Sequence, residues 1–479
     1  MLEKRKLWKL MRLFDKREQS KVSYWLKGEL RGHHGATYQL FELMCDPEVS
    51  IEQIWASLYP HKALPERPFY DSSFRRLEHS LSGLLETWLA IDSFRQEGKE
   101  MDHHLLRALN RRNAKELFSA KYKKVRRRLE EQPARDSSYH RELYRLTEEH
   151  LIYLMKFDKL RYRSTSSGLL EKWEQTVVHE RLRHGLTAIN SLSTFHDATY
   201  EGCASKYLAN TQKWLDIKRV DNDPVLKIYY HLILLISGRG DVWLMEKELK
   251  ENLHLFSAID QINVYTTFLN YCFRRSVTDS SPELLQKILT LLEWGLEKRL
   301  IYLRGTLRET MYRSLIMSCI FSHQLELGEY YLEKLKEDLL PEIRDEVYSY
   351  TKGRLLVAKG EYHEATKYLY KKFRLPRLEF RARKLMIQIK YERGERVELE
   401  NEIRALLLYS ERSKTLHRVL RNQIKKEYKL LDRLIQSFRK DDLLRLREEV
   451  SELNTLFDRN WLLEKIDEKL NCVHTPLLD

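Results

Sequence analysis

Residues that break helices are scarce in this chain, and it has no long apolar run. Its 479 residues include only 16 glycines and 10 prolines, a composition typical of long helices with few interruptions. No stretch approaches the ~18 consecutive apolar residues that a membrane-spanning helix needs; the apolar run at 232–236 is far shorter. The first 15 residues mix apolar and charged side chains, which predicts an amphipathic helix rather than a signal peptide. We therefore expect no membrane span.

Cysteine is also infrequent. The five cysteines are scattered and odd in number, and none has a partner at the short spacing of a zinc knuckle: Cys45, Cys203, Cys272, Cys319 and Cys472. A disulfide framework would show a larger, paired set. This pattern predicts a protein of the reducing cytoplasm.

Motifs of catalysis and metal binding are missing as well. His179 and Glu180 are followed by His184, whereas a zinc-binding HExxH helix needs its histidines four residues apart. A spacing of five turns the second ring about 140° around a helix. The segment 237–240 is too short for a phosphate cradle, and no GxSxG motif occurs. We therefore expect a protein that is not an enzyme, with no catalytic residue, no metal site and no cofactor.

Charged and apolar residues, in contrast, are abundant. Hydrophobic residues make up 42% of the chain and charged residues 33%, enough apolar surface to build a core. The formal net charge is +14. A basic balance favours anionic partners such as nucleic acid or acidic proteins through long-range attraction, although a solvated basic surface without a specific ligand is the simpler interpretation.

A pair of glycines reveals a repeat. Gly360 and Gly394 are 34 residues apart (394 − 360), the period of a helix–turn–helix repeat. The pattern predicts a first helix at 348–359 that ends in a left-handed cap at Gly360, where the missing Cβ removes a steric penalty. Apolar residues at three- and four-residue steps from Tyr362 predict a second helix, and Ala365 is small where two helices approach closely.

These residues resemble the tetratricopeptide repeat. Gly353, Gly360, Tyr362 and Ala365 fit the small and aromatic positions of that family, whereas Ser349 stands where the family has a tryptophan. Two repeat units match strongly, and the chain is similar to the family over roughly residues 225–440. This longer pattern also resembles a group of bacterial helical-repeat proteins, a resemblance that implies no function. The fold class implied is all-α, an α-solenoid of stacked helical hairpins with an N-terminal helical module.

Such a solenoid has a concave groove that binds other proteins. The resemblance implies a peptide or helix in this groove, held by residues of the first helix of each repeat. The candidate protein-binding residues are Tyr348, Arg354, Arg381, Lys384 and Tyr391.

A basic band offers an alternative function. Six of the eight residues from 121 to 128 are cationic, so charge covers most of the helix circumference and suits a surface that follows phosphates. A solvated helix balanced by acidic neighbours is the competing interpretation. The candidate nucleic-acid-binding residues are Arg107, Arg111, Arg112, Lys121, Lys123, Lys124, Arg126, Arg127 and Arg128.

Residues 50–90 offer a second alternative. Ser50 and Gln53 form a capping box at the start of a short helix, a proline-containing loop follows, and the next helix carries Arg75, Arg76 and His79. This order loosely resembles the helix-turn-helix core of winged-helix DNA-binding domains. The loop is longer than the usual turn, and no alternating strands follow, so packing within the scaffold is the favoured interpretation.

The chain thus divides into four predicted parts. An N-terminal helical module occupies 1–132, before the breaker-rich linker around Pro133, and the solenoid occupies 133–410. Capping helices at 411–470 cover the last apolar face, and 471–479 is a flexible tail. The expected function is a cytoplasmic scaffold for protein–protein interaction. A nucleic-acid- or ribosome-associated protein and a DNA-binding regulator are the alternatives.

Overall fold

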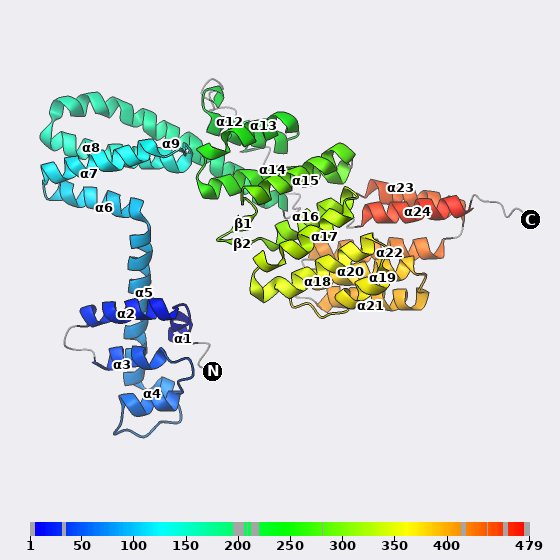
Figure 1. Ribbon diagram of the computed structural model, residues 1–479, viewed down its shortest axis with the longest axis horizontal. Helices are drawn as coiled ribbons and strands as arrows, with labels where there is room; N and C mark the ends of the chain where they lie inside the picture. The colour runs from blue at the N-terminus through cyan, green and yellow to red at the C-terminus, as the bar shows by residue number, and fades with distance from the viewer. Residues whose placement is uncertain are drawn as a thin grey trace, which may run out of the picture. The chain divides into compact units, whose positions relative to one another are not determined.

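The chain folds into two compact units, Met1–Arg181 and Leu182–Asp479 (Figure 1). The computed structural model describes residues 5–30, 35–194, 206–207, 209–211, 220–279, 281–412, 418–437, 439–453 and 458–473. The boundary between the units falls inside one long helix, whereas the linker around Pro133 separates two helices of the first unit. No helix among the described residues is long and apolar enough to cross a membrane.

The first unit consists of helices only, within its described residues. Their bounds are α1 (Lys6–Met11), α2 (Lys16–Glu29), α3 (Gly35–Met44), α4 (Ile51–Leu58), the 3-10 turn η2 (Pro68–Tyr70), α5 (Ser72–Gln96), α6 (Gly98–Arg111), α7 (Lys115–Glu131), α8 (Ser137–Phe157) and α9 (Lys159–Thr194). Helices α1–α5 enclose one apolar core and α6–α8 another, and α5 connects the two groups (Figure 1).

Local signals in the sequence set several of these helix starts. The predicted capping box at Ser50 and Gln53 is present at α4, with each side chain bonded to the backbone of the other residue. Helix α1 is amphipathic as predicted, because Leu7 and Met11 are buried while Lys9 is exposed. The N-terminal amphipathic segment is therefore part of the folded core.

The second unit continues as a series of helices. Its bounds are α12 (Pro224–Ile236), α13 (Val242–Asn252), η3 (Leu253–Leu255), α14 (Ala258–Thr278), α15 (Pro282–Glu297), β1 (Tyr302–Leu303), β2 (Thr306–Leu307), α16 (Glu309–Phe321), α17 (Leu325–Lys334), η4 (Lys336–Asp338), α18 (Pro341–Ala358), α19 (Tyr362–Leu369), α20 (Pro376–Glu392), α21 (Arg396–Arg412), α22 (Arg418–Gln436), α23 (Lys440–Glu452) and α24 (Arg459–Val473). The antiparallel β1–β2 hairpin is the only strand pairing in the described part of the chain. The predicted all-α class is confirmed.

Packing in this unit follows sequence order. From α14 to α24 each α-helix packs against the next, and α12 also contacts α14, α16 contacts α18, and α18 contacts α20. The helix predicted at 348–359 begins earlier, at Pro341, because proline fits the first turn of a helix, where its missing N–H has no partner to lose. The C-terminal helices α22–α24 share one apolar core with α20 and α21.

Left-handed residues recur at the helix ends. Gly360 has φ 78° and Gly394 has φ 67°, as the predicted caps require. In each case the next residue donates its N–H to the carbonyl five positions back, for example Glu361 to Leu356. The left-handed residue itself donates to the carbonyl three positions back, as Gly360 does to Val357. Both hydrogen bonds and a positive φ also occur at the turns centred on Asn113, Gly238, Arg299 and His323. The glycine pattern therefore found only some of the equivalent turns.

A hydroxyl connects the two helices of several pairs. Tyr265 of α14 donates to the carbonyl of Leu291 in α15, at 3.0 Å, and Tyr312 of α16 donates to Leu332 of α17, at 2.7 Å. In the α18–α19 pair, Ser349 donates to the carbonyl of Tyr368 at 2.9 Å. Ser349, which departs from the repeat pattern that the sequence resembles, thus makes a buried polar contact between helices.

Candidate functional site

A groove of about 490 Å³ crosses helices α16, α18 and α20 of the second unit. Residues at helical spacing supply its walls, because side chains three, four or eight positions apart share one face of a helix. The lining residues are Arg313, Met317 and Phe321 from α16, Tyr350, Thr351 and Arg354 from α18, Arg377, Phe380, Arg381, Lys384, Leu385 and Gln388 from α20, and Asp458 beside α24. These three helices pack in succession, α16 on α18 and α18 on α20 (Figure 1).

Three of the five residues predicted for protein binding lie on this groove, namely Arg354, Arg381 and Lys384. The other two pack elsewhere. Tyr348 donates a 2.7 Å hydrogen bond to Glu333 of α17, and it is two positions from Tyr350, about 200° around the helix. Tyr391 packs edge-on against Trp461, with ring centroids 5.3 Å apart.

Sequence reasoning missed the contribution of α16. Arg313, Met317 and Phe321 follow each other at steps of four, so one face of α16 carries a cation, a thioether and an aromatic ring. That spacing was visible in the sequence. Which face of α16 meets α18 depends on tertiary packing, however, and the apolar stripe alone did not decide it.

Arg313 is the most unusual side chain of the groove. Only 7% of its surface is exposed. It forms an ion pair with Glu309, at a nitrogen–oxygen distance of 3.1 Å, and Glu309 also pairs with Arg377. Burial and then the charge of Arg381 lower the pKa of the Arg313 guanidinium below its usual value. Arg313 is therefore a buried cation that shares its carboxylate partner with Arg377.

Lys384 is the second buried cation. Its ammonium lies 2.7 Å from the Asp458 carboxylate and 3.6 Å from that of Glu427. Arg354 instead donates to the side-chain amide oxygen of Gln388, at 3.1 Å. A carboxylate of the chain itself, that of Asp458, therefore already pairs with one cation of the lining.

The predicted basic band lies on α6 and α7, where ion pairs hold part of it. Lys121 and Arg128 both pair with Asp102, which is buried. Arg107 pairs with Glu149 at 2.8 Å, and Arg126 and Arg127 pair with the glutamates four residues ahead. The remaining cations of the band are exposed: Arg111, Arg112, Lys123 and Lys124.

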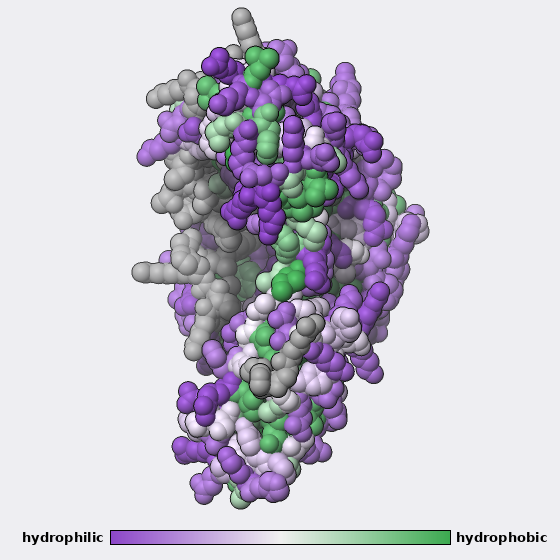
Figure 2. Space-filling model, turned by 90° about the vertical axis from the view of Figure 1, so that its left-hand side faces the viewer, coloured by the Kyte–Doolittle hydropathy of each residue, from purple (hydrophilic) through white to green (hydrophobic). Residues whose placement is uncertain are grey.

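Hydrophilic residues cover much of the face of the molecule that Figure 2 shows. Figure 2 shows one face of the molecule, on which hydrophilic side chains predominate and smaller hydrophobic areas lie between them. A band of cations on one helix is therefore weak evidence for a ligand unless its charges lack carboxylate neighbours.

The helix-turn-helix-like module carries a second basic surface. Arg75, Arg76 and His79 line a cleft of about 1030 Å³ at the start of α5, together with Arg5 and Lys6 of the N-terminal segment. Arg5 donates to Glu78 at 2.7 Å and Lys6 pairs with Glu86 at 2.7 Å. The three residues predicted as DNA readers therefore share one surface. No strand follows α5 in the described residues of this unit, so the module has no wing there.

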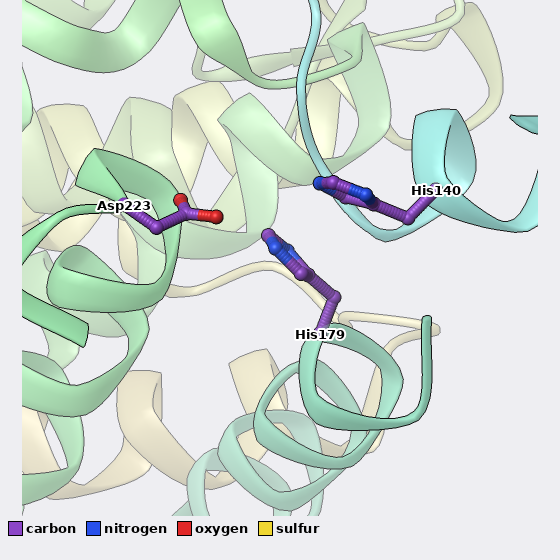
Figure 3. Close-up of side chains that lie close together, drawn as sticks. All are labelled: His140, His179 and Asp223. Atoms are coloured by element: carbon purple, nitrogen blue, oxygen red, sulfur yellow. The ribbon is translucent and has the colours of Figure 1, made fainter. Parts of the chain in front are cut away.

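The histidines near the HExxH-like spacing diverge as predicted. His179 is buried in α9 and stacks on His140 of α8, with ring centroids 4.1 Å apart (Figure 3), while His184 is exposed. The third residue labelled in Figure 3, Asp223, belongs to the second unit, where it caps α12 by accepting hydrogen bonds from Val225 and Leu226. His179 and His184 thus face different sides of α9.

Three of the cysteines have side chains that the structure describes, and none of the three forms a disulfide. Cys45, Cys272 and Cys319 are free. Burial raises the pKa of the Cys272 thiol to about 12, and that of Cys319 to about 12, so neither is a thiolate at neutral pH. These two thiols therefore serve as packing groups rather than nucleophiles.

Comparison with known proteins gives no relative: no family model, no curated protein and no solved structure matches this chain.

Proposed function

We propose that this chain is a tetratricopeptide-like helical-repeat scaffold, without enzymatic activity, that binds another protein in the groove across α16, α18 and α20. The occupant is an extended peptide or a single helix of the partner. The fold class is supported by the sequential packing of the helices and by the recurring left-handed turns, two of which lie one repeat period apart.

One observation carries the functional proposal. Arg354, Arg381 and Lys384, chosen from the repeat pattern alone, meet on one groove although they come from two different helices. The same groove contains aromatic rings beside the cations, including Phe321, which is 51% exposed. Aromatic and arginine side chains dominate the binding energy of protein interfaces, and a groove of this volume admits a peptide segment.

Affinity purification from the native cell tests this function. The tagged chain is recovered with and without nuclease treatment, beside an Arg381→Glu variant of the groove. Arg445→Glu is the matched control, because Arg445 is an exposed arginine of α23 outside the groove. We expect a protein partner that survives nuclease, is lost with Arg381→Glu and is retained with Arg445→Glu. A partner retained by both variants argues against the groove.

A DNA-binding regulator is the second candidate function. The observation in its favour is the shared cleft of Arg75, Arg76 and His79, with Arg5 and Lys6 beside them. Under this proposal the N-terminal half of α5 reaches base edges and the second unit acts as the sensor. Binding to random-sequence duplex DNA, compared between the parent and an Arg75→Gln/Arg76→Gln variant, tests it.

A further inference from the structure

Among the described residues, the cations of the groove outnumber the carboxylates that pair with them. Five cationic side chains line it: Arg313, Arg354, Arg377, Arg381 and Lys384. Three carboxylates of the described residues pair with this set, Glu309 with two arginines, and Asp458 and Glu427 both with Lys384. Among the described residues, Arg354 bonds to a neutral amide, and Arg381 is exposed. The described lining of the groove therefore carries a positive excess.

Arg313 adds an unsatisfied donor to this excess. Its Nε is buried and has no hydrogen-bond partner among the described residues, and its side chain is 91% buried at a wall of the groove. Leaving a buried charged donor unpaired costs the full desolvation penalty of that group. Native structures rarely leave such groups unpaired, and each one calls for a partner such as an ordered water, an ion or a ligand group. The donor set of a guanidinium matches a planar carboxylate in two parallel hydrogen bonds.

The chain itself shows which anion this surface accepts. In the lining of the groove, the Asp458 carboxylate binds the Lys384 ammonium at 2.7 Å. Arg313, Arg354 and Arg381 belong to the same lining, in which Asp458 is the only carboxylate among the described residues. Met317 and Phe321 follow Arg313 along α16 and supply apolar contact area beside the cations.

We infer that the occupant of this groove is an acidic segment of the partner protein, with a Glu or Asp side chain seated on Arg313 and Arg381 and an apolar side chain against Met317 and Phe321. This inference rests on the proposed function and names the chemistry of the partner. A carboxylate at this place completes the Arg313 hydrogen bonds and is itself desolvated, so the pair contributes to affinity as well as to specificity.

The inference is tested with two short fluorescein-labelled peptides and the full-length chain. One peptide alternates Glu with Leu and the other alternates Gln with Leu, so that they differ only in charge. Fluorescence anisotropy at physiological ionic strength measures binding to the parent and to the Arg313→Met, Arg381→Gln and Arg445→Gln variants. We expect the Glu peptide to bind about tenfold or more tightly than the Gln peptide, a difference of about 1.4 kcal/mol. Arg313→Met and Arg381→Gln should each abolish that preference, and Arg445→Gln should retain it.

The melting temperature separates a ligand-binding Arg313 from a structural one. Glu309 keeps its pairing with Arg377 when Arg313 is replaced, and an apolar side chain of similar length removes the unpaired donor. We expect Arg313→Met to melt at or above the temperature of the parent while losing the preference for the Glu peptide. A lower melting temperature with an unchanged preference means that Arg313 is structural, and it overturns the inference.

Two further outcomes are decisive. If both peptides bind equally well to the parent and lose affinity together in Arg381→Gln, the groove binds peptides without reading charge; the inference is wrong while the proposed function stands. If the Glu peptide does not bind the parent, the acidic-segment inference is also wrong, and the native-partner purification still decides the scaffold function on its own. Should Arg313→Met fail to fold, Arg381→Gln carries the test, because Arg381 is exposed.

Discussion

The hydroxyl of Tyr312 donates a 2.7 Å hydrogen bond to the backbone carbonyl of Leu332 and so connects α16 to α17. The ring is completely buried, and α16 forms one wall of the groove. The same connection occurs between Tyr265 and Leu291 one helix pair earlier. The walls of the groove are therefore held by polar contacts inside each pair as well as by apolar packing.

Replacing Tyr312 by Phe should destabilise the protein. The substitution keeps the ring but removes the donor, and we expect a loss of about 1 kcal/mol in the free energy of unfolding. Urea unfolding followed by circular dichroism measures it. Tyr330→Phe is the control, because that side chain is 53% exposed and its hydroxyl bonds only at the surface to Lys334. Equal urea unfolding midpoints for the two variants would show that this hydrogen bond does not stabilise the fold.

Gly360→Ala tests the repeat turn. A Cβ at Gly360 meets no atom within 4 Å, so the whole effect comes from φ 78°, where a side chain costs roughly 1–2 kcal/mol. Gly83 of α5 also has open space around it but lies inside a helix, where alanine is better than glycine by about 0.5–1 kcal/mol. The melting temperature should therefore fall for Gly360→Ala and rise for Gly83→Ala. If it changes in the same direction for both variants, Gly360 is not the left-handed turn residue.

His150 should make the stability of the first unit depend on pH. Burial, and then the charges of Arg126 and Arg161, lower its pKa from 6.5 to about 4, and its ring stacks on Tyr122 at 4.0 Å between centroids. Between pH 6.5 and about 4, the unfolded chain binds a proton at His150 that the folded chain does not. The stability that comes from burying the neutral ring is therefore complete above pH 6.5 and is lost as the pH falls toward 4.

A pair of histidine variants isolates that contribution. Melting temperatures of the parent, His150→Gln and His61→Gln are compared across this range; His61 is exposed in the same unit. We expect the difference between the parent and His150→Gln to shrink on acidification, and the difference for His61→Gln to stay constant. A constant difference for His150→Gln would show that the ring titrates normally.

The basic band on α6 and α7 should bind nucleic acid only weakly. Ion pairs with carboxylates already hold Arg107, Lys121 and Arg128. We expect association with RNA or DNA to vanish near physiological salt, and the change of Lys123, Lys124, Arg126, Arg127 and Arg128 to Gln to leave helicity intact. A filter-binding titration over salt concentration measures it. Tight binding that persists at physiological salt and depends on those five residues would favour the nucleic-acid alternative.

The sequence by itself determined the helices and the glycine turns of this protein. Breaker residues, capping boxes and the step between Gly360 and Gly394 act within a few residues, so the chain carries them without reference to its fold. Local signals also separated His179 from His184, because a spacing of five residues cannot place both rings on one side of a helix.

Only the tertiary structure decided the groove. Arg313, Arg381 and Asp458 come from distant parts of the chain, and no local pattern says that α16, α18 and α20 present them to one space. From residue type alone, Tyr348 and Tyr350 were equal candidates for the groove. The packing of α18 turns Tyr348 toward Glu333 of α17, whereas Tyr350 lines the groove. The left-handed turns at Arg299 and His323 were not visible in the sequence, whereas Asn113 is of a residue type that adopts this conformation more readily than most. A glycine indicates a left-handed turn in the sequence. A residue with a Cβ adopts the left-handed conformation only when surrounding contacts outweigh the strain.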